Sequence, residues 1–309
     1  MQTKHIIISM VLILQGILGY AQQDPMFTQY QNNMMAVNSA YAGSKEALNV
    51  VAISRHQWVN FEGAPTTQSI AINTPFFDKE LGLGFSFVRD QVGPLKADNF
   101  YIDIAYKLKV HEGGHLSMGL KSGLHNRKNN LRELNPLNEN DPSFQKDIVS
   151  ELYPNFGTGF YYYTDKYYLG VSAPKLSQIG YRKDDNPNLG NSEMKRHYYV
   201  VGGYVWDINQ QFQFKPTFLT KMVQGAPPSF DITANVRYNN KIIGGISHRF
   251  GDSFGALIQV KALSQIWIGY SYDFTISEMS RYNSGTHEIM INLDLNLSKK
   301  DIIESSRFF

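Results

Sequence analysis

The sequence predicts an all-β protein: a transmembrane, antiparallel, up-and-down β-barrel of about 14 strands with an N-terminal lead-in or plug segment. Three observations lead to this prediction. Apolar and polar residues alternate with period two along fourteen runs, the spacing of a strand with two different faces. The connections between these runs alternate between long and short, as they do in outer-membrane barrels. Aromatic residues make up 13% of the chain, and both β-propensity and interfacial aromatic belts favour them inside strands.

The first 21 residues have the features of a cleaved signal peptide. Lys4 and His5 precede an apolar stretch over residues 6–18, and Gly19-Tyr20-Ala21 offers small residues at both cleavage positions. We therefore expect residues 1–21 to be a signal peptide and the mature chain to begin near Gln22. An uncleaved membrane anchor is the alternative, but the apolar stretch is shorter than the roughly 20 residues that span a bilayer. The chain has no cysteine, so an exported form carries neither disulfides nor a lipidated N-terminal cysteine.

Residues 22–45 follow no strand or helix period and are rich in Asn, Gln and Met. One interpretation is a disordered terminus. The segment nevertheless contains more large apolar side chains than solvent favours: Met26, Phe27, Tyr30, Met34, Met35 and Tyr41. We therefore expect it to be an irregular lead-in or plug that packs against or inside the scaffold that follows.

The barrel is predicted to span residues 46–297, with residues 298–309 as a periplasmic C-terminal tail. The run 229–238 is typical, because Phe230, Ile232 and Ala234 alternate with Asp231 and Thr233. Most runs have about 8 to 12 residues, close to the 9 to 11 of a tilted membrane strand. The predicted strands lie near residues 47–56, 66–73, 81–89, 98–109, 115–124, 155–163, 167–173, 197–206, 211–220, 229–238, 241–249, 254–262, 264–273 and 286–297.

The connections assign the two ends of the barrel. Long connections include residues 57–65, 125–154, 174–196 and 274–285, and tight turns such as Asn239-Asn240 separate them. With an even number of strands and both termini on the periplasmic side, the long connections emerge outside the cell. A soluble β-sandwich would bury the same apolar faces in a core, but a sandwich does not require this regular alternation of long and short connections.

Catalytic and cofactor chemistry has little support in the sequence. His111-Glu112-Gly113-Gly114-His115 matches the two-histidine zinc pattern by letter, but that pattern needs a helix, and Gly113-Gly114 favours a hairpin turn. No nucleophile elbow or phosphate-binding glycine loop is present. A net charge of +2 gives no case for nucleic acid. We expect no enzyme activity, no cofactor and no metal.

Charged residues on the polar strand faces point into the predicted lumen. They either line a path for a solute or form ion pairs that fill a lumen too wide for side chains alone, and we favour the second interpretation. These residues are Asp103, Lys107, Lys121, Lys215, Asp231, Arg237, Lys261, Asp273 and Asp294.

The long connections combine aromatic and charged residues beyond what turn closure requires, which predicts contact with a partner. The richest stretch is residues 55–69. The candidate partner-binding residues are Arg55, Trp58, Phe61, Glu62, Lys221, Gly225, Ala226, Pro227, His287 and Glu288. The alternative for the first connection is a structural role, in which Arg55, Trp58 and Glu62 fold back to close the barrel mouth.

Short motifs in family order resemble the PorP/SprF family. They span the mature chain and are specific as a set: Asp24-Pro25-Met26-Phe27-Thr28-Gln29-Tyr30, Ala40-Tyr41-Ala42-Gly43-Ser44, Arg55-His56-Gln57-Trp58, Phe61-Glu62-Gly63-Ala64-Pro65, Pro154-Asn155-Phe156-Gly157, Lys215-Pro216, Gly225-Ala226-Pro227 and Gly285-Thr286-His287-Glu288. The resemblance implies an outer-membrane barrel of Bacteroidetes linked to type IX secretion and gliding motility.

For this chain, the resemblance implies a non-enzymatic barrel in the cell outer membrane that anchors, or helps to export or display, a type IX-secreted surface protein such as a gliding adhesin. Its partners would be that cargo, outer-membrane lipid, and periplasmic peptidoglycan-binding or secretion-system components. The polar lumen motivates an alternative function, an outer-membrane channel for solutes or a transporter of hydrophobic solutes.

Overall fold

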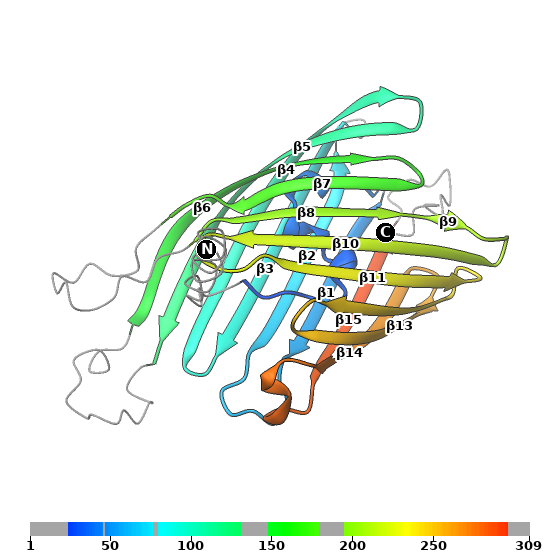
Figure 1. Cartoon of the computed structure of the whole chain (residues 1–309). Helices are drawn as coiled ribbons and strands as arrows, with labels where there is room; N and C mark the ends of the chain where they lie inside the picture. The colour runs from blue at the N-terminus through cyan, green and yellow to red at the C-terminus, as the bar shows by residue number, and fades with distance from the viewer. Residues whose placement is uncertain (1–23, 46, 77–79, 131–147, 179–194, 296–309) are drawn as a thin grey trace, which may run out of the picture.

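The computed structural model describes residues 24–45, 47–76, 80–130, 148–178 and 195–295. The described chain begins with three short helical segments and continues as strands (Figure 1). The helical segments are η1 (Tyr30–Asn32), α2 (Met34–Val37) and η2 (Ser39–Tyr41), and η5 (Glu278–Arg281) precedes the last strand. The strands are β1 (Leu48–His56), β2 (Thr66–Phe76), β3 (Leu81–Val92), β4 (Leu95–His111), β5 (Gly114–Asn129), β6 (Ile148–Tyr163), β7 (Tyr167–Lys175), β8 (His197–Tyr204), β9 (Trp206–Asp207), β10 (Phe212–Val223), β11 (Ser229–Tyr238), β12 (Ile242–Arg249), β13 (Ser253–Leu263), β14 (Ile266–Thr275) and β15 (Thr286–Leu295).

The strands form one antiparallel sheet that closes on itself. Each strand pairs with its neighbours in the chain, and β1 pairs with β15 from Leu48↔Leu295 to His56↔His287. The two-residue strand β9 continues the line of β8 and pairs with β10. The structure is therefore a closed barrel of 14 strands with one short additional strand, and closure leaves no unpaired sheet edge in the membrane.

All fourteen predicted runs are confirmed as strands of this barrel, with two differences in their lengths. Strands β4, β5 and β6 have 17, 16 and 16 residues, longer than expected. Pairing between β5 and β6 continues to Asn129↔Ile148, inside the stretch predicted as a loop. The run 197–206 divides between β8 and β9 at Val205, whose N–H donates to Lys166 O.

The connections lie at two ends of the barrel, which we call the loop mouth and the turn mouth. The loop mouth is the end at which β1, β3, β5, β7, β10, β12 and β14 end, and its described connections are residues 57–65, 93–94, 224–228, 250–252 and 276–285. The turn mouth is the opposite end, where β1 begins and β15 ends, and its described connections are residues 112–113, 164–166, 205–211, 239–241 and 264–265.

The two faces of the barrel wall differ as the alternation predicts. Along β2 and β11, buried and exposed residues alternate almost without interruption. The exposed positions are apolar, as at Ile102, Leu120 and Ile246, which are 59%, 68% and 67% exposed. A continuous apolar outer surface is what a bilayer requires of a spanning barrel. Among the described helices, none is long and apolar enough to cross a membrane.

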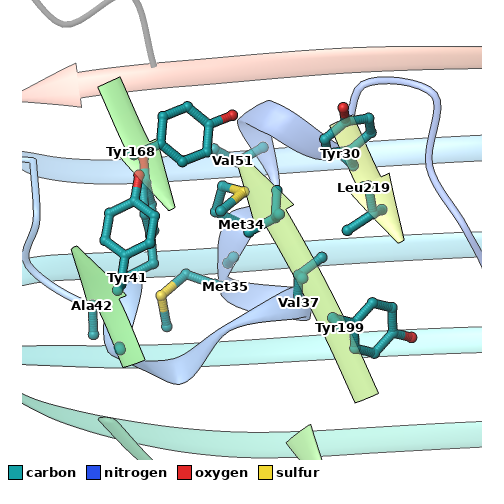
Figure 2. Close-up of a cluster of buried hydrophobic side chains, with 14 of the residues drawn as sticks. Tyr30, Met34, Met35, Val37, Tyr41, Ala42, Val51, Tyr168, Tyr199 and Leu219 are labelled. Atoms are coloured by element: carbon teal, nitrogen blue, oxygen red, sulfur yellow. The ribbon is translucent and has the colours of Figure 1, made fainter. Parts of the chain in front are cut away.

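Residues 24–45 fold inside the barrel and form its core, as the sequence predicted; we call them the plug. Figure 2 shows plug residues Tyr30, Met34 and Tyr41 packed against wall residues Tyr168 and Leu219. The inward charges largely form ion pairs or hydrogen bonds to the plug. Lys121 binds Asp103 at 2.8 Å and donates to Met35 O, and Lys107 donates to Gly43 O at 2.8 Å. These contacts support the interpretation of the inward charges as lumen-filling groups.

Two wall glycines let the plug backbone lie directly against the sheet. A Cβ on Gly119 would lie 2.2 Å from Ala40 N and 2.4 Å from Ser39 C. A Cβ on Gly82 would lie 1.9 Å from Ala42 O. All three distances are shorter than real Cβ contacts, so only glycine permits this close approach.

The expectation that both termini lie at the turn mouth is wrong for the start of the described chain. Asp24 lies beside Lys175, His197 and Lys221, which stand at the loop-mouth ends of β7, β8 and β10. Lys45 pairs with Asp294 at the turn mouth. The plug thus runs the length of the lumen before β1 begins, a direction that the parity of the strands does not determine. Residues 1–21 and 298–309 lie outside the described ranges.

Candidate functional site

The connection between β1 and β2 is a compact, hydrogen-bonded loop. Gln57 N–H donates to Pro65 O at 2.9 Å, and Phe61 N–H donates to Trp58 O at 3.0 Å. Trp58 has φ +50°, Asn60 +71° and Gly63 +73°. Asparagine and glycine tolerate this left-handed region, but a bulky tryptophan rarely adopts it, and such residues cost on the order of 1–3 kcal/mol. The loop therefore holds Trp58 in a conformation that its neighbours must enforce.

Those neighbours belong to the connection between β14 and β15. Val59 N–H donates to Gly285 O at 2.9 Å, and Ser284 N–H donates to Val59 O at 2.8 Å. The Asn60 amide donates to Ser284 Oγ at 2.8 Å. Because these bonds join two loops that flank the β1–β15 seam, residues 57–65 and 276–285 form one ordered structure, which we call the rim.

The rim presents aromatic and charged side chains to solvent. Phe61 is 41% exposed and Tyr282 is 64% exposed, while Trp58 is half-buried. Glu62 and Arg281, in the same two loops, are also exposed. The predicted contact residues Trp58, Phe61 and Glu62 thus lie together at the loop mouth, on a loop whose backbone is already ordered.

Arg55 and Glu288 do not reach this surface, because both are buried in the lumen. Arg55 Nη1 lies 3.2 Å from Glu288 Oε2 and 3.0 Å from Asp273 Oδ2. Glu288 also accepts the backbone N–H groups of Thr28 and Gln29 at 3.0 and 2.9 Å. These contacts attach the loop-mouth part of the plug, at Thr28 and Gln29, to β1, β14 and β15. A buried charge needs such partners, and this requirement explains why ionisable residues stand on inward strand positions.

Lys221 is the third predicted contact residue that lies in the lumen. It is buried and donates to Asp24 O at 3.2 Å. The Asp24 carboxylate lies 2.5 Å from Lys175 Nζ and 3.7 Å from His197 Nδ1. Burial works against ionisation of Asp24, but the ammonium groups of Lys175, which is hydrogen-bonded to the carboxylate, and of Lys221 favour the charged form, and the pKa of this carboxyl lies well below its ordinary value. We call Asp24 and its three partners the Asp24 clamp.

The remaining predicted residues lie apart from the rim. His287 lies on the outer wall, where Nδ1 is 2.7 Å from Tyr270 Oη and the ring contacts Tyr272. Gly225, Ala226 and Pro227 form the β10–β11 connection, with Gly225 at φ +84°. Alternation along one strand separates His287 from Glu288, since neighbouring residues face opposite sides of a sheet.

The sequence reasoning missed Asp24, Lys175 and His197, which complete the clamp. No sequence feature marks these three residues strongly, because Lys175 and His197 border a predicted loop and Asp24 belongs to a segment without a strand or helix period. Thr28 was also missed, although its hydroxyl accepts from Arg55 at 2.9 Å and donates to Asp273 at 2.6 Å.

The letter match to a zinc motif is a turn, as predicted. His111 Nε2 lies 2.8 Å from Tyr162 Oη, and His115 stacks on Tyr163 at 5.2 Å between ring centroids. Tyr162 and Tyr163 are adjacent on β6 and face opposite sides, so the two histidines cannot share a ligand. Within the described ranges, no group of three His, Asp or Glu side chains could hold a metal.

Taken together, the closed wall, the apolar outer surface and the plugged lumen define an outer-membrane β-barrel. The family model of the type IX secretion system membrane protein PorP/SprF matches residues 19–293. The chain belongs to the PorP/SprF family and is a membrane barrel of type IX secretion, located in the outer membrane. Membership implies interaction with secretion-system components and cargo in general.

Solved structures similar to the chain are outer-membrane barrels with little sequence identity. The CymD monoaromatic hydrocarbon channel is 11% identical, with 91% of this chain and 95% of that chain covered and a TM-score of 0.49. Omp33 of Acinetobacter baumannii is 9% identical over 81% of this chain and 97% of that chain, with a TM-score of 0.43. The NanC porin is 10% identical over 81% of this chain and 100% of that chain, with a TM-score of 0.41. No curated protein sequence matches the chain.

Proposed function

We propose that this barrel is a non-enzymatic anchor that holds a type IX-secreted surface protein, such as a gliding adhesin, at the cell surface and helps to export or display it. Membership of the family links the barrel to type IX secretion. The rim is the candidate docking surface for the cargo. Periplasmic partners, including peptidoglycan-binding proteins, would meet the opposite, turn mouth.

The observation that carries this proposal is the rim. Two loops far apart in sequence are joined by backbone hydrogen bonds on either side of Val59, and their aromatic side chains are exposed at one end of the barrel. An ordered surface loses little conformational entropy when a partner binds, and exposed aromatics are frequent anchors in protein interfaces. The rim therefore suits protein docking better than simple loop closure.

The filled lumen supports an anchor over a channel. Tyr30, Met34 and Met35 are at most 2% exposed inside the barrel, and the plug contacts the wall from one mouth to the other. A solute path along the axis would have to displace this core. The wall and the plug would then serve to keep the rim in place.

A double Ala substitution at Trp58 and Phe61 tests the proposal. We expect the variant to fold and reach the outer membrane, but to retain much less of its surface cargo than the wild type. The measurement is the amount of cargo on intact cells, together with the proteins that co-purify with the detergent-solubilised barrel.

A matched control removes similar apolar surface at the other mouth. Trp206 and Ile208 are 63% and 58% exposed at the turn mouth, and Ala at both positions should leave cargo retention unchanged. Equal barrel levels and heat-modifiable gel mobility establish that each variant is folded. Wild-type cargo retention by the folded Trp58/Phe61 variant would refute docking on the rim.

A further inference from the structure

The plug crosses the lumen in a defined direction. Near the loop mouth, Thr28 and Gln29 bind Glu288. Deeper in the barrel, Val37 O accepts from Ser172 Oγ at 2.8 Å. Near the turn mouth, Gly43 N–H donates to Asn73. The order of these contacts follows the order of the residues, so the plug passes once from the loop mouth to the turn mouth.

The two ends of the plug are held differently. At the turn mouth the plug continues along the chain into β1, so covalent connectivity holds that end. Near the loop mouth, Glu288 and Arg55 bind Thr28 and Gln29, and the Asp24 clamp holds the first residue that the structure describes. Asp24 N–H donates to His197 Nε2 at 3.3 Å, and His197 Nδ1 donates to Lys195 O at 2.9 Å. Lys175 binds the carboxylate and Lys221 binds the carbonyl oxygen. Both the side chain and the backbone of Asp24 are therefore hydrogen-bonded to the wall.

We propose that the amino-terminal end of the plug, Asp24 and Pro25, is presented at the loop mouth on the same side as the rim, and that the Asp24 clamp is the latch that keeps it there. Displacement of the plug then begins at Asp24, because the other end is tethered to β1. A partner at the loop mouth could reach this latch, whereas one at the turn mouth would meet the tethered end. The inference goes beyond cargo anchoring and is tested without cargo.

Single cysteines test the direction, since the chain has no native cysteine to interfere. Pro25→Cys and Lys45→Cys probe the two ends of the plug, which are both half-buried. Glu62→Cys and Glu112→Cys mark the loop mouth and the turn mouth at exposed positions. Each variant is labelled with a membrane-impermeant maleimide on intact cells and on permeabilised cells, and heat-modifiable mobility confirms that it is folded.

We expect Pro25→Cys to follow the Glu62→Cys marker and Lys45→Cys to follow the Glu112→Cys marker. Labelling of Pro25→Cys only under the conditions that label Glu112→Cys would overturn the inferred direction. The comparison does not assume which mouth is extracellular, because the two markers establish it.

The latch is tested by opening it. Adding Lys175→Met to the Pro25→Cys variant removes the closest cation, and we expect the labelling rate at position 25 to rise several-fold. The matched control is Lys166→Met, which removes a lysine that is 61% exposed and 3.9 Å from Asp207 at the turn mouth, and which should leave the rate unchanged. An unchanged rate in the folded Lys175→Met variant, or no labelling of its Pro25→Cys site under the conditions that label Glu62→Cys, would refute the latch.

Discussion

Arg55 is the cation on which the loop-mouth end of the plug depends. Its side chain is 2% exposed, and its two acidic partners Glu288 and Asp273 are 0% and 5% exposed. Removing the cation leaves two buried carboxylates without their partner. We expect Arg55→Met to lower the free energy of unfolding by about 3–5 kcal/mol, measured by urea titration of the barrel in detergent with gel mobility as the readout.

A surface ion pair supplies the control for Arg55. Arg89 binds Asp98 at 2.6 Å, but its side chain is 49% exposed. Arg89→Met should therefore change the free energy of unfolding by no more than about 1 kcal/mol. Adding Glu288→Gln to Arg55→Met should restore part of the lost stability, because it replaces one of the two buried carboxylates that have lost their cation with a neutral amide. Similar losses for the two Arg variants would contradict the structural role assigned to Arg55.

Asp24 makes a pH-dependent contribution whose sign follows from its environment. The clamp lowers the pKa of Asp24 below its ordinary value of 3.8. A carboxyl with a lowered folded-state pKa stabilises the folded protein above the unfolded pKa, and the contribution is lost as the pH falls through the folded pKa. Asp24→Asn should thus lower the temperature of the gel-mobility shift at about pH 7 and pH 5, and the difference should shrink near pH 2. A difference that grows under acid would contradict this assignment.

At the scale of elements, the plug and the wall fit because glycines face the plug backbone. A branched side chain on Gly119 would overlap Ala40 and Ser39, which belong to the η2 segment. We expect Gly119→Val to destabilise the barrel by about 1–3 kcal/mol or to push residues 38–42 off the wall. Urea titration measures the first effect, and faster protease cleavage within residues 24–45 measures the second.

Gly244 provides the matched control in another strand. Nothing lies within 4 Å of a Cβ built on it, and it faces outward on β12. Gly244→Val should fold with the stability of the wild type, since valine suits a lipid-facing strand position. If both valine variants behaved alike, close approach of the plug backbone would not explain Gly119.

How much of each element the sequence predicts depends on its periodicity. Positions such as Ile102, Asp103 and Ile104 identify a strand and its faces, because side chains on a membrane strand alternate between the apolar outer face and the polar lumen. The plug has no period, so only its apolar content predicted burial. Its direction depends on contacts between residues up to 260 positions apart, such as Thr28 with Glu288, which no local pattern encodes.

The candidate site shows the same limit. The sequence grouped Arg55 with Trp58, and Glu288 with His287, because they are close along the chain. In the barrel a shift of one residue changes the face, and the end of a strand separates lumen from rim. Trp58, Phe61 and Glu62 lie together because they share one loop, whereas the plug anchors combine strands with a segment that precedes them. Spacing alone could identify the first group and not the second.

At the scale of the whole molecule, the plug determines whether a barrel of this size conducts ions. Barrels of 16–18 strands leave an aqueous channel, and those of about 8 strands are filled by side chains. This 14-stranded wall is wide enough to need a filling, and residues 24–45 supply it with a buried core of Tyr30, Met34, Met35 and Tyr41.

We therefore expect the wild-type barrel to be silent in planar lipid bilayers and a variant that lacks residues 24–44 to conduct. The deletion exposes inward polar groups such as Lys107, Lys121 and Asp103, which then line a hydrated lumen. Heat-modifiable mobility of the deletion variant must first show that the wall closes without its core. Steady conductance of the wild type at the level of the deletion variant would support the solute channel and contradict the anchor. A folded deletion variant that stays silent would show that something other than residues 24–44 closes the lumen.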